Sequence, residues 1–181
     1  MKTRVVSVFL ALLVASSAFG QGTILFSTFV PGAANVDARI SGPDGRGLGA
    51  YGASAQLFLV DGGTYTPLLP ATTFRTGTSN PSEQFYVVPP SDAVVVPGIG
   101  AGEQATIVMR AWTGPSFNSA LLRGETAPLT IILGGTPAGG NAPLPPAFLS
   151  NLQGFVIFPE PSVTALALVG AAALLLGKRK C

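Results

Sequence analysis

Short stretches of alternating hydrophobic and polar residues dominate the middle of this 181-residue chain. Side chains that alternate with a period of two point to opposite faces of a β-strand, so the pattern predicts strands with one buried face. The strongest candidates are residues 53–60 and 105–112. In the second stretch, the alternation places Ile107, Met109 and Ala111 on one face and Val108, Arg110 and Trp112 on the other.

Weaker runs of the same kind predict further strands. We expect them at 22–30, 36–40, 74–76, 83–88, 93–96, 129–133 and 154–158, with a hairpin partner of 53–60 opening at Tyr65. Within 36–40, Asp37 and Arg39 share the outward face, and we expect a solvated ion pair between them.

Glycine and proline separate these runs, and no helical pattern of ten residues lies between them. Short strands with frequent turns predict an all-β fold, an antiparallel β-sandwich or jelly-roll-like domain over residues 21–157. Within it, residues 134–146 consist largely of glycine and proline and predict a loop or linker stiffened by its prolines. The alternative is a disordered coat protein, but the period-two runs of β-branched and aromatic residues argue against it.

Both ends of the chain differ from this body. Residues 1–20 have the order of a secretory signal peptide, with Lys2 and Arg4 before an apolar stretch and the small residues Ala18 and Gly20 around a cleavage position after Gly20. A retained N-terminal anchor is the alternative, but the apolar stretch is short for a membrane span.

Residues 158–181 contain three elements in order. Pro159-Glu160-Pro161 comes first, followed by an uncharged run at about 163–177 and then by Lys178, Arg179 and Lys180. Fifteen helical residues extend about 22 Å, which is short for a hydrocarbon core of about 30 Å, although basic side chains can snorkel to the interface. The three cations favour a transmembrane helix over a buried core helix.

This order resembles the PEP-CTERM sorting signal of exported bacterial proteins, with Pro159, Glu160 and Pro161 as the signature triplet and Lys178, Arg179 and Lys180 as the basic membrane stop. The body is also similar to short β-rich proteins of that type, through residues 55–58, 108–112 and 152–155. The resemblance implies recognition by an exosortase, a membrane-embedded transpeptidase-like enzyme. It further implies cleavage near the triplet and delivery to the cell surface or extracellular matrix, with the tail on the cytoplasmic side.

Without the two ends, the charge of the chain changes sign. The formal net charge of the whole chain is +2, but residues 21–161 carry five arginines against eight carboxylates, a net charge of −3, and contain no lysine. Nucleic-acid binding therefore lacks its electrostatic basis. The single cysteine, Cys181, excludes a disulfide in the body.

Few residue types remain for chemistry. The chain has no histidine, and its body has no cysteine or lysine, which removes the usual nucleophile systems and the commonest zinc ligands. A pair of carboxylates is the chemistry left for a surface hydrolase, the third hypothesis, although turn chemistry explains most of the acidic residues. The candidates are Asp37, Asp44, Asp61, Glu83, Asp92, Glu103 and Glu125. No loop has the spacing of a calcium site, and we expect neither a metal nor a cofactor.

The sequence therefore predicts an exported, non-enzymatic cell-surface or matrix protein that is the substrate of an exosortase. The alternative is a carbohydrate-binding module for exopolysaccharide, with Trp112 and Arg110 as its exposed platform. The aromatic residues available to such a module are Tyr51, Tyr65, Tyr86, Trp112 and Phe117. A lone tryptophan in such a strand can equally belong to the core.

Overall fold

The structure is a computed structural model that describes residues 20–32, 34–137 and 141–159. The predicted signal peptide up to residue 19, the membrane segment, Glu160, Pro161 and the basic residues 178–180 lie outside the described residues. No helix in the described ranges is long and apolar enough to cross a bilayer.

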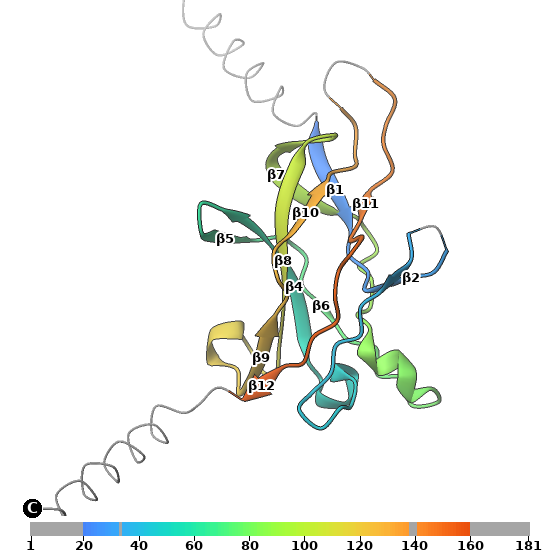
Figure 1. The fold of residues 1–181 in the computed structure, drawn as a ribbon, viewed down its shortest axis with the longest axis vertical. Coiled ribbons are helices and arrows are strands. Elements are labelled where there is room, and N and C mark those ends of the chain that lie inside the picture. Colours follow the sequence, from blue (N-terminus) through green and yellow to red (C-terminus); the bar gives the residue numbers. More distant parts are fainter. Residues whose placement is uncertain (1–19, 33, 138–140, 160–181) are drawn as a thin grey trace, which may run out of the picture.

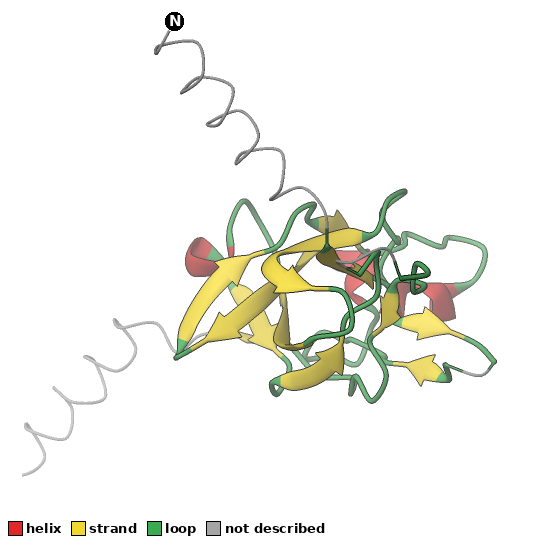
Figure 2. Ribbon diagram, turned by 90° about the horizontal axis from the view of Figure 1, so that it is seen from above, coloured by secondary structure: helices red, strands yellow, loops and turns green. Residues whose placement is uncertain are grey.

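The described chain is mostly β-structure in antiparallel sheets, which confirms the predicted class (Figures 1 and 2). The larger sheet has seven strands in the order β12-β9-β8-β4-β5, with β10 paired to β8 and β6 paired to β4. Its members are β4 (Ser54–Asp61), β5 (Thr64–Pro67), β6 (Thr72–Thr73), β8 (Gln104–Trp112), β9 (Leu122–Glu125), β10 (Leu129–Ile132) and β12 (Phe158–Pro159).

The smaller sheet joins distant parts of the chain in the order β11-β1-β7. It contains β1 (Gln21–Leu25), β7 (Val94–Gly100) and β11 (Ala147–Phe148), and its β1–β11 pair is parallel. A separate two-stranded ribbon pairs β2 (Phe29–Val30) with β3 (Val36–Asp37). The 3-10 helices are η2 (Leu48–Tyr51), η3 (Pro81–Phe85) and η4 (Phe117–Ser119).

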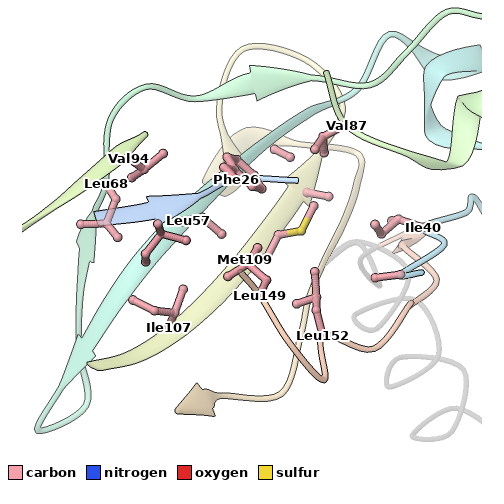
Figure 3. Close-up of a cluster of buried hydrophobic side chains, with 14 of the residues drawn as sticks. Phe26, Ile40, Leu57, Leu68, Val87, Val94, Ile107, Met109, Leu149 and Leu152 are labelled. Carbon is pink, nitrogen blue, oxygen red and sulfur yellow. The ribbon is translucent and has the colours of Figure 1, made fainter. Parts of the chain in front are cut away.

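One hydrophobic cluster receives side chains from both sheets. β8 supplies Ile107 and Met109, β4 supplies Leu57, and β7 supplies Val94 and Val96 (Figure 3). Ala111 also belongs to this cluster, so the predicted face of residues 107, 109 and 111 is the core face. Burial of these apolar side chains is the main force that holds the two sheets together.

The predicted hairpin at Tyr65 is confirmed. β4 ends at Asp61, Gly62 and Gly63 form the turn, and β5 returns from Thr64, which pairs with Asp61. Both glycines have positive φ, 53° and 83°, which is the requirement of a tight two-residue turn that matches the twist of the strands.

Other predicted strands are shorter or are absent. Residues 22–30 do not form one strand, because β1 ends at Leu25 and the polar side chains of Ser27 and Thr28 turn inward and bond to backbone groups. The strand expected at 83–88 is wrong over its first half, because η3 occupies Pro81–Phe85. There the Asn80 side chain accepts a hydrogen bond from the Ser82 N–H at 3.2 Å, and proline stands at the first helical position.

Four further strands differ from the predicted ones, and the first of them, β3, ends at Asp37 within the predicted 36–40. The edge strand expected at 74–76 lies instead at β6, and Phe74 makes an isolated bridge to Val87. β7 continues to Gly100, beyond the predicted 93–96, and the strand expected at 154–158 is reduced to an isolated bridge at Val156 and to β12.

Residues 134–146 begin beside β1 of the smaller sheet and then fold back on themselves. Gly134 pairs with Thr23 of β1, and Gly135 pairs with Leu144. A Cβ on Gly134 would lie 1.9 Å from the Pro145 carbonyl oxygen, so this close approach requires glycine. The segment thus leads the chain back to the smaller sheet, where β11 follows it.

The two ends of the described body lie far apart (Figure 1). The carbonyl of Gly20 accepts a hydrogen bond from Ala101, close to the start of β8, whereas Phe158 joins β9 beside the end of β8 at Trp112. The nine residues of β8 at about 3.3 Å each separate these ends by about 30 Å.

Candidate functional site

The strand registers gather polar and aromatic side chains on the outer face of the larger sheet. One row of paired residues runs Phe158, Arg123, Trp112 and Ser54, and the next runs Glu125, Arg110 and Gln56. Directly paired residues share a face, so both rows lie opposite the core side of β8. The sequence correctly placed Arg110 and Trp112 on one face, away from residues 107, 109 and 111.

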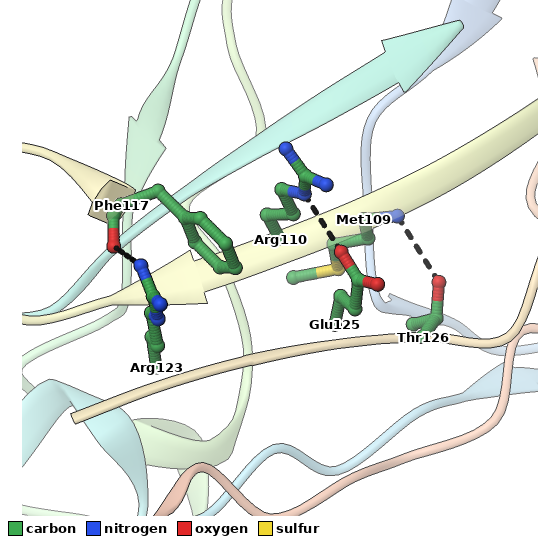
Figure 4. Close-up of polar contacts among 6 residues, drawn as sticks. All are labelled: Met109, Arg110, Phe117, Arg123, Glu125 and Thr126. Carbon is green, nitrogen blue, oxygen red and sulfur yellow. Dashed lines mark hydrogen bonds and ion pairs between the residues drawn. The ribbon is translucent and has the colours of Figure 1, made fainter. Parts of the chain in front are cut away.

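Arg110 lies at the centre of this surface. Its guanidinium carbon lies 4.0 Å from the ring centroid of Tyr65, 4.6 Å from that of Phe117 and 4.8 Å from that of Phe58. Its Nε donates to a Glu125 carboxylate oxygen at 2.7 Å (Figure 4). The Arg110 side chain is 17% exposed, so solvent screens this ion pair only in part.

A second arginine reaches the same ring. The guanidinium of Arg123 lies 5.1 Å from the centroid of Phe117, and its Nη1 donates to the Phe117 carbonyl at 3.0 Å (Figure 4). Phe117 begins η4, so the two arginines fix that turn against the sheet. Cation–π contacts of this kind contribute about 0.5–1 kcal/mol each at exposed sites.

Trp112 is not the exposed ring that a carbohydrate platform on this residue requires. It is only 7% exposed, and its ring meets Phe117 edge to face at 6.2 Å between centroids. Its Nε1–H is buried and has no acceptor among the described residues. The exposed ring in the same row is Phe158, which is 60% exposed.

Two hollows flank Phe117 and Arg110. The Phe158 hollow, of about 370 Å³, is lined by Arg110, Phe117, Arg123, Gly124, Glu125, Phe158 and Pro159. The Phe58 hollow, of about 320 Å³, is lined by Gln56, Phe58, Pro67, Arg110, Trp112, Pro115, Ser116, Phe117 and Asn118. Sequence reasoning missed Phe58, Arg123 and Phe158 here, because only the strand registers bring these residues together.

The first residue of the predicted sorting triplet belongs to this end of the sheet. Pro159 is the last described residue of the chain, and it pairs with Leu122 in β9. The triplet therefore begins at a strand that is already part of the folded body. Glu160 and Pro161 follow outside the described residues.

The acidic candidates for hydrolase chemistry bond to different neighbours. Asp37 accepts a hydrogen bond from the Tyr86 hydroxyl at 2.7 Å, and Glu103 accepts one from the Gly100 N–H at 2.7 Å. Asp44 accepts from Tyr51 and forms an ion pair with Arg46 at 3.5 Å. Within the described ranges, no three acidic, cysteine or histidine residues cluster as metal ligands.

The ion pair expected between Asp37 and Arg39 is wrong, because Asp37 accepts its hydrogen bond from Tyr86 and Arg39 packs on the Phe85 ring. Both side chains point outward as predicted, but Arg39 lies 4.4 Å from the centroid of the Phe85 ring. Burial, and then the hydrogen bond to Asp37, raise the pKa of Tyr86 above its ordinary value. The hydrogen bond from Tyr51 lowers the pKa of Asp44, and the same bond raises the pKa of Tyr51.

Comparisons with protein-family models, with curated proteins and with solved structures find no match for this chain.

Proposed function

We propose that this chain is the precursor of an exported, non-enzymatic cell-surface or extracellular-matrix protein, sorted by an exosortase-type enzyme. The observation that carries the proposal is the order of Pro159-Glu160-Pro161, an apolar run at about 163–177 and Lys178-Arg179-Lys180 in a chain with a signal-like segment at 1–20. The membrane is then a transient anchor, and the enzyme is the partner that cuts near the triplet.

The described fold overlaps the predicted sorting segment. Phe158 and Pro159, the last described residues, form β12 and pair with β9, so the first residue of the triplet lies in a strand of the body. We further infer that the body is a β-sandwich of jelly-roll-like type, because side chains of both sheets form one core cluster. Such a body can fold without a disulfide, which matches its lack of cysteine.

The chemistry of the body supports a non-enzymatic role. It lacks histidine, lysine and cysteine, and several of its carboxylates are engaged by separate tyrosine, arginine and backbone groups. A general acid–base pair needs two carboxyl groups on either side of one substrate bond. The carboxylates that have these partners lie on different elements, which does not favour such a pair.

The test is the intact mass of the protein recovered from the cells that produce it. We expect a chain that starts at Gln21 and lacks residues 174–181, because both terminal segments are removed. Replacing Pro159 and Pro161 together by alanine should leave the C-terminal segment attached, whereas the same change at Pro89 and Pro90 in the body should not affect processing. A wild-type mass that still includes residues 174–181 would contradict the proposal and leave a simple membrane anchor.

A further inference from the structure

Three exposed apolar side chains lie around the point where the described chain ends. Val156 and Phe158 are 38% and 60% exposed and alternate with Ile157, which is fully buried, so both point away from the core. Leu121 is 83% exposed and directly precedes β9, whose first residue pairs with Pro159. Leu121, Val156 and Phe158 together form the terminal patch, at the end of the body where β9 and β12 lie in Figure 1.

A short connection links the terminal patch to the apolar run at about 163–177. Three residues, 160–162, lie between Pro159 and Val163, and four Cα–Cα steps extend at most about 14 Å. The headgroup layer on one side of a bilayer is about 5–8 Å thick. When the run begins at the hydrocarbon boundary, the end of the body therefore lies no more than about 9 Å beyond the headgroups.

We propose that the terminal patch docks on the surface of the bilayer that holds the apolar run. The inference rests on the membrane anchor of the proposed function. Removal of apolar side chains from water is favourable, and an aromatic ring suits the boundary between lipid and water. Because the anchor already holds this end of the body near the surface, docking is an intramolecular step with a high effective concentration, and a few side chains suffice.

The charges near the terminal patch do not oppose this contact. Glu125 of β9 is ion-paired with Arg110 at 2.7 Å. Asp44 is ion-paired with Arg46 at 3.5 Å, in the turn that follows the residue bridged to Val156. Neither carboxylate presents an unpaired charge to the headgroups. Residues 21–161 as a whole carry −3, which predicts weaker docking on anionic lipid than on zwitterionic lipid.

The experiment places the full-length chain in phosphatidylcholine nanodiscs and measures the fluorescence of single bimane labels. Cys181 is replaced by serine, and the label is attached at Leu121→Cys, at Phe158→Cys or, as a control, at Ile132→Cys. Ile132 is 61% exposed and lies beside the start of β8, about 30 Å away. A nitroxide on the lipid headgroup should quench the labels at 121 and 158 and leave the label at 132 unchanged. Iodide in the water should quench the label at 132 most.

Matched variants separate docking from mere closeness to the anchor. The reporter is a label at Asn118→Cys, an exposed position three residues before Leu121. Leu121→Asp with Phe158→Asp should lower the ratio of docked to undocked bodies by at least about tenfold, measured as lost quenching by the headgroup nitroxide. The control pair Leu69→Asp and Ile132→Asp, at positions 73% and 61% exposed, should leave the quenching unchanged. Leu121→Asp alone should give part of the loss without touching β12.

Equal accessibility of all three labels to iodide, or equal quenching in the patch and control variants, would overturn the proposal. Labels at 121 and 158 that are shielded from iodide yet not quenched by the lipid would also overturn it, and would assign the terminal patch to a contact with a second copy of the chain. A chain that does not enter the nanodiscs would contradict the membrane anchor and this inference together. A chain that enters them without docking contradicts this inference alone.

Discussion

Two buried threonine hydroxyls in this protein accept hydrogen bonds from backbone N–H groups that a regular sheet would pair with a neighbouring strand. Thr28 accepts from Val87 and Thr126 accepts from Met109, each at 3.1 Å. The Thr126 bond is drawn beside the ion pair of Arg110 in Figure 4. Single side chains thus replace the backbone hydrogen bonds between strands at the points where the chain leaves a strand.

Replacement of Thr28 by valine should destabilise the body by about 1–3 kcal/mol, because the Val87 N–H stays buried and loses its acceptor. Thr130→Val is the matched control on the exposed side of β10, and it should change the free energy of unfolding by less than about 0.5 kcal/mol. Urea titration of both variants measures the difference. Equal effects would show that the Thr28 hydroxyl is not required.

The contact between Tyr51 and Asp44 predicts a pH effect confined to acid. The pKa of Asp44 is lowered below 3.8 in the folded state, chiefly by the Tyr51 hydroxyl. The stability that this contact provides is therefore present above that value and is lost as the pH falls through the folded-state pKa. Tyr51→Phe should raise the Asp44 pKa in an NMR titration, whereas Tyr65→Phe should not. An unchanged Asp44 pKa in Tyr51→Phe would contradict the assignment.

At the scale of elements, the sequence predicted those strands whose side chains alternate over a long run. β4 and β8 fall within one residue of the predicted 53–60 and 105–112, and the turn at Gly62-Gly63 follows from the two glycines alone. β9 was not predicted, because Leu-Arg-Gly-Glu has no apolar alternation and is a strand only through its pairing with β8 and β12.

The same limit applies to the candidate site. Arg110 and Trp112 could be placed on one face from their spacing, but the contacts with Phe58, Arg123 and Phe158 depend on which strands are neighbours. Sequence period does not determine strand order, so those partners could not be predicted. The burial of Trp112 also depends on Phe117, which lies on a separate 3-10 turn.

Gly134 offers a test of how residues 134–146 are attached. Gly134→Ala should destabilise the body by about 1–3 kcal/mol or more, because its Cβ would collide with backbone atoms of Pro145 and Pro146. Gly124→Ala is a graded control, since its Cβ would meet side-chain atoms of Ile157 and Phe155 at 3.2 Å and the Ile157 Cα at 3.3 Å, which are much longer contacts than those at Gly134. Thermal unfolding should rank the two variants in that order. The opposite order would mean that 134–146 is loosely attached.

At the scale of the whole molecule, the larger sheet brings together residues that are far apart in the chain. Phe158 and Thr73 lie at the two ends of one row through Arg123, Trp112 and Ser54. Four strand spacings of about 4.8 Å give a separation of about 20 Å. An unfolded chain of the same 85-residue separation spans roughly 50 Å.

Spin labels on Thr73→Cys and Phe158→Cys, in a chain whose native Cys181 is replaced by serine, should give a narrow distance distribution near 20 Å. Pulsed electron–electron double resonance measures label distances in this range. A broad distribution centred near 50 Å would restore the disordered coat protein that the sequence left as an alternative. The label pair Thr73→Cys and Thr66→Cys, whose β4 partners Ser54 and Leu59 lie five residues or about 17 Å apart along that strand, provides a control that does not involve β12.

Residues 20 and 159 are separated by the length of β8, so the body extends about 30 Å between its two described ends. When the body is attached through its C-terminal end, the Phe158 hollow lies at the attached end. The turn between β7 and β8 then lies at the opposite end. Cutting the chain beyond Pro159 would therefore release the body at the end where this hollow lies. The opposite end, with the exposed Ile132 of β10, is the part of the body most distant from residue 159.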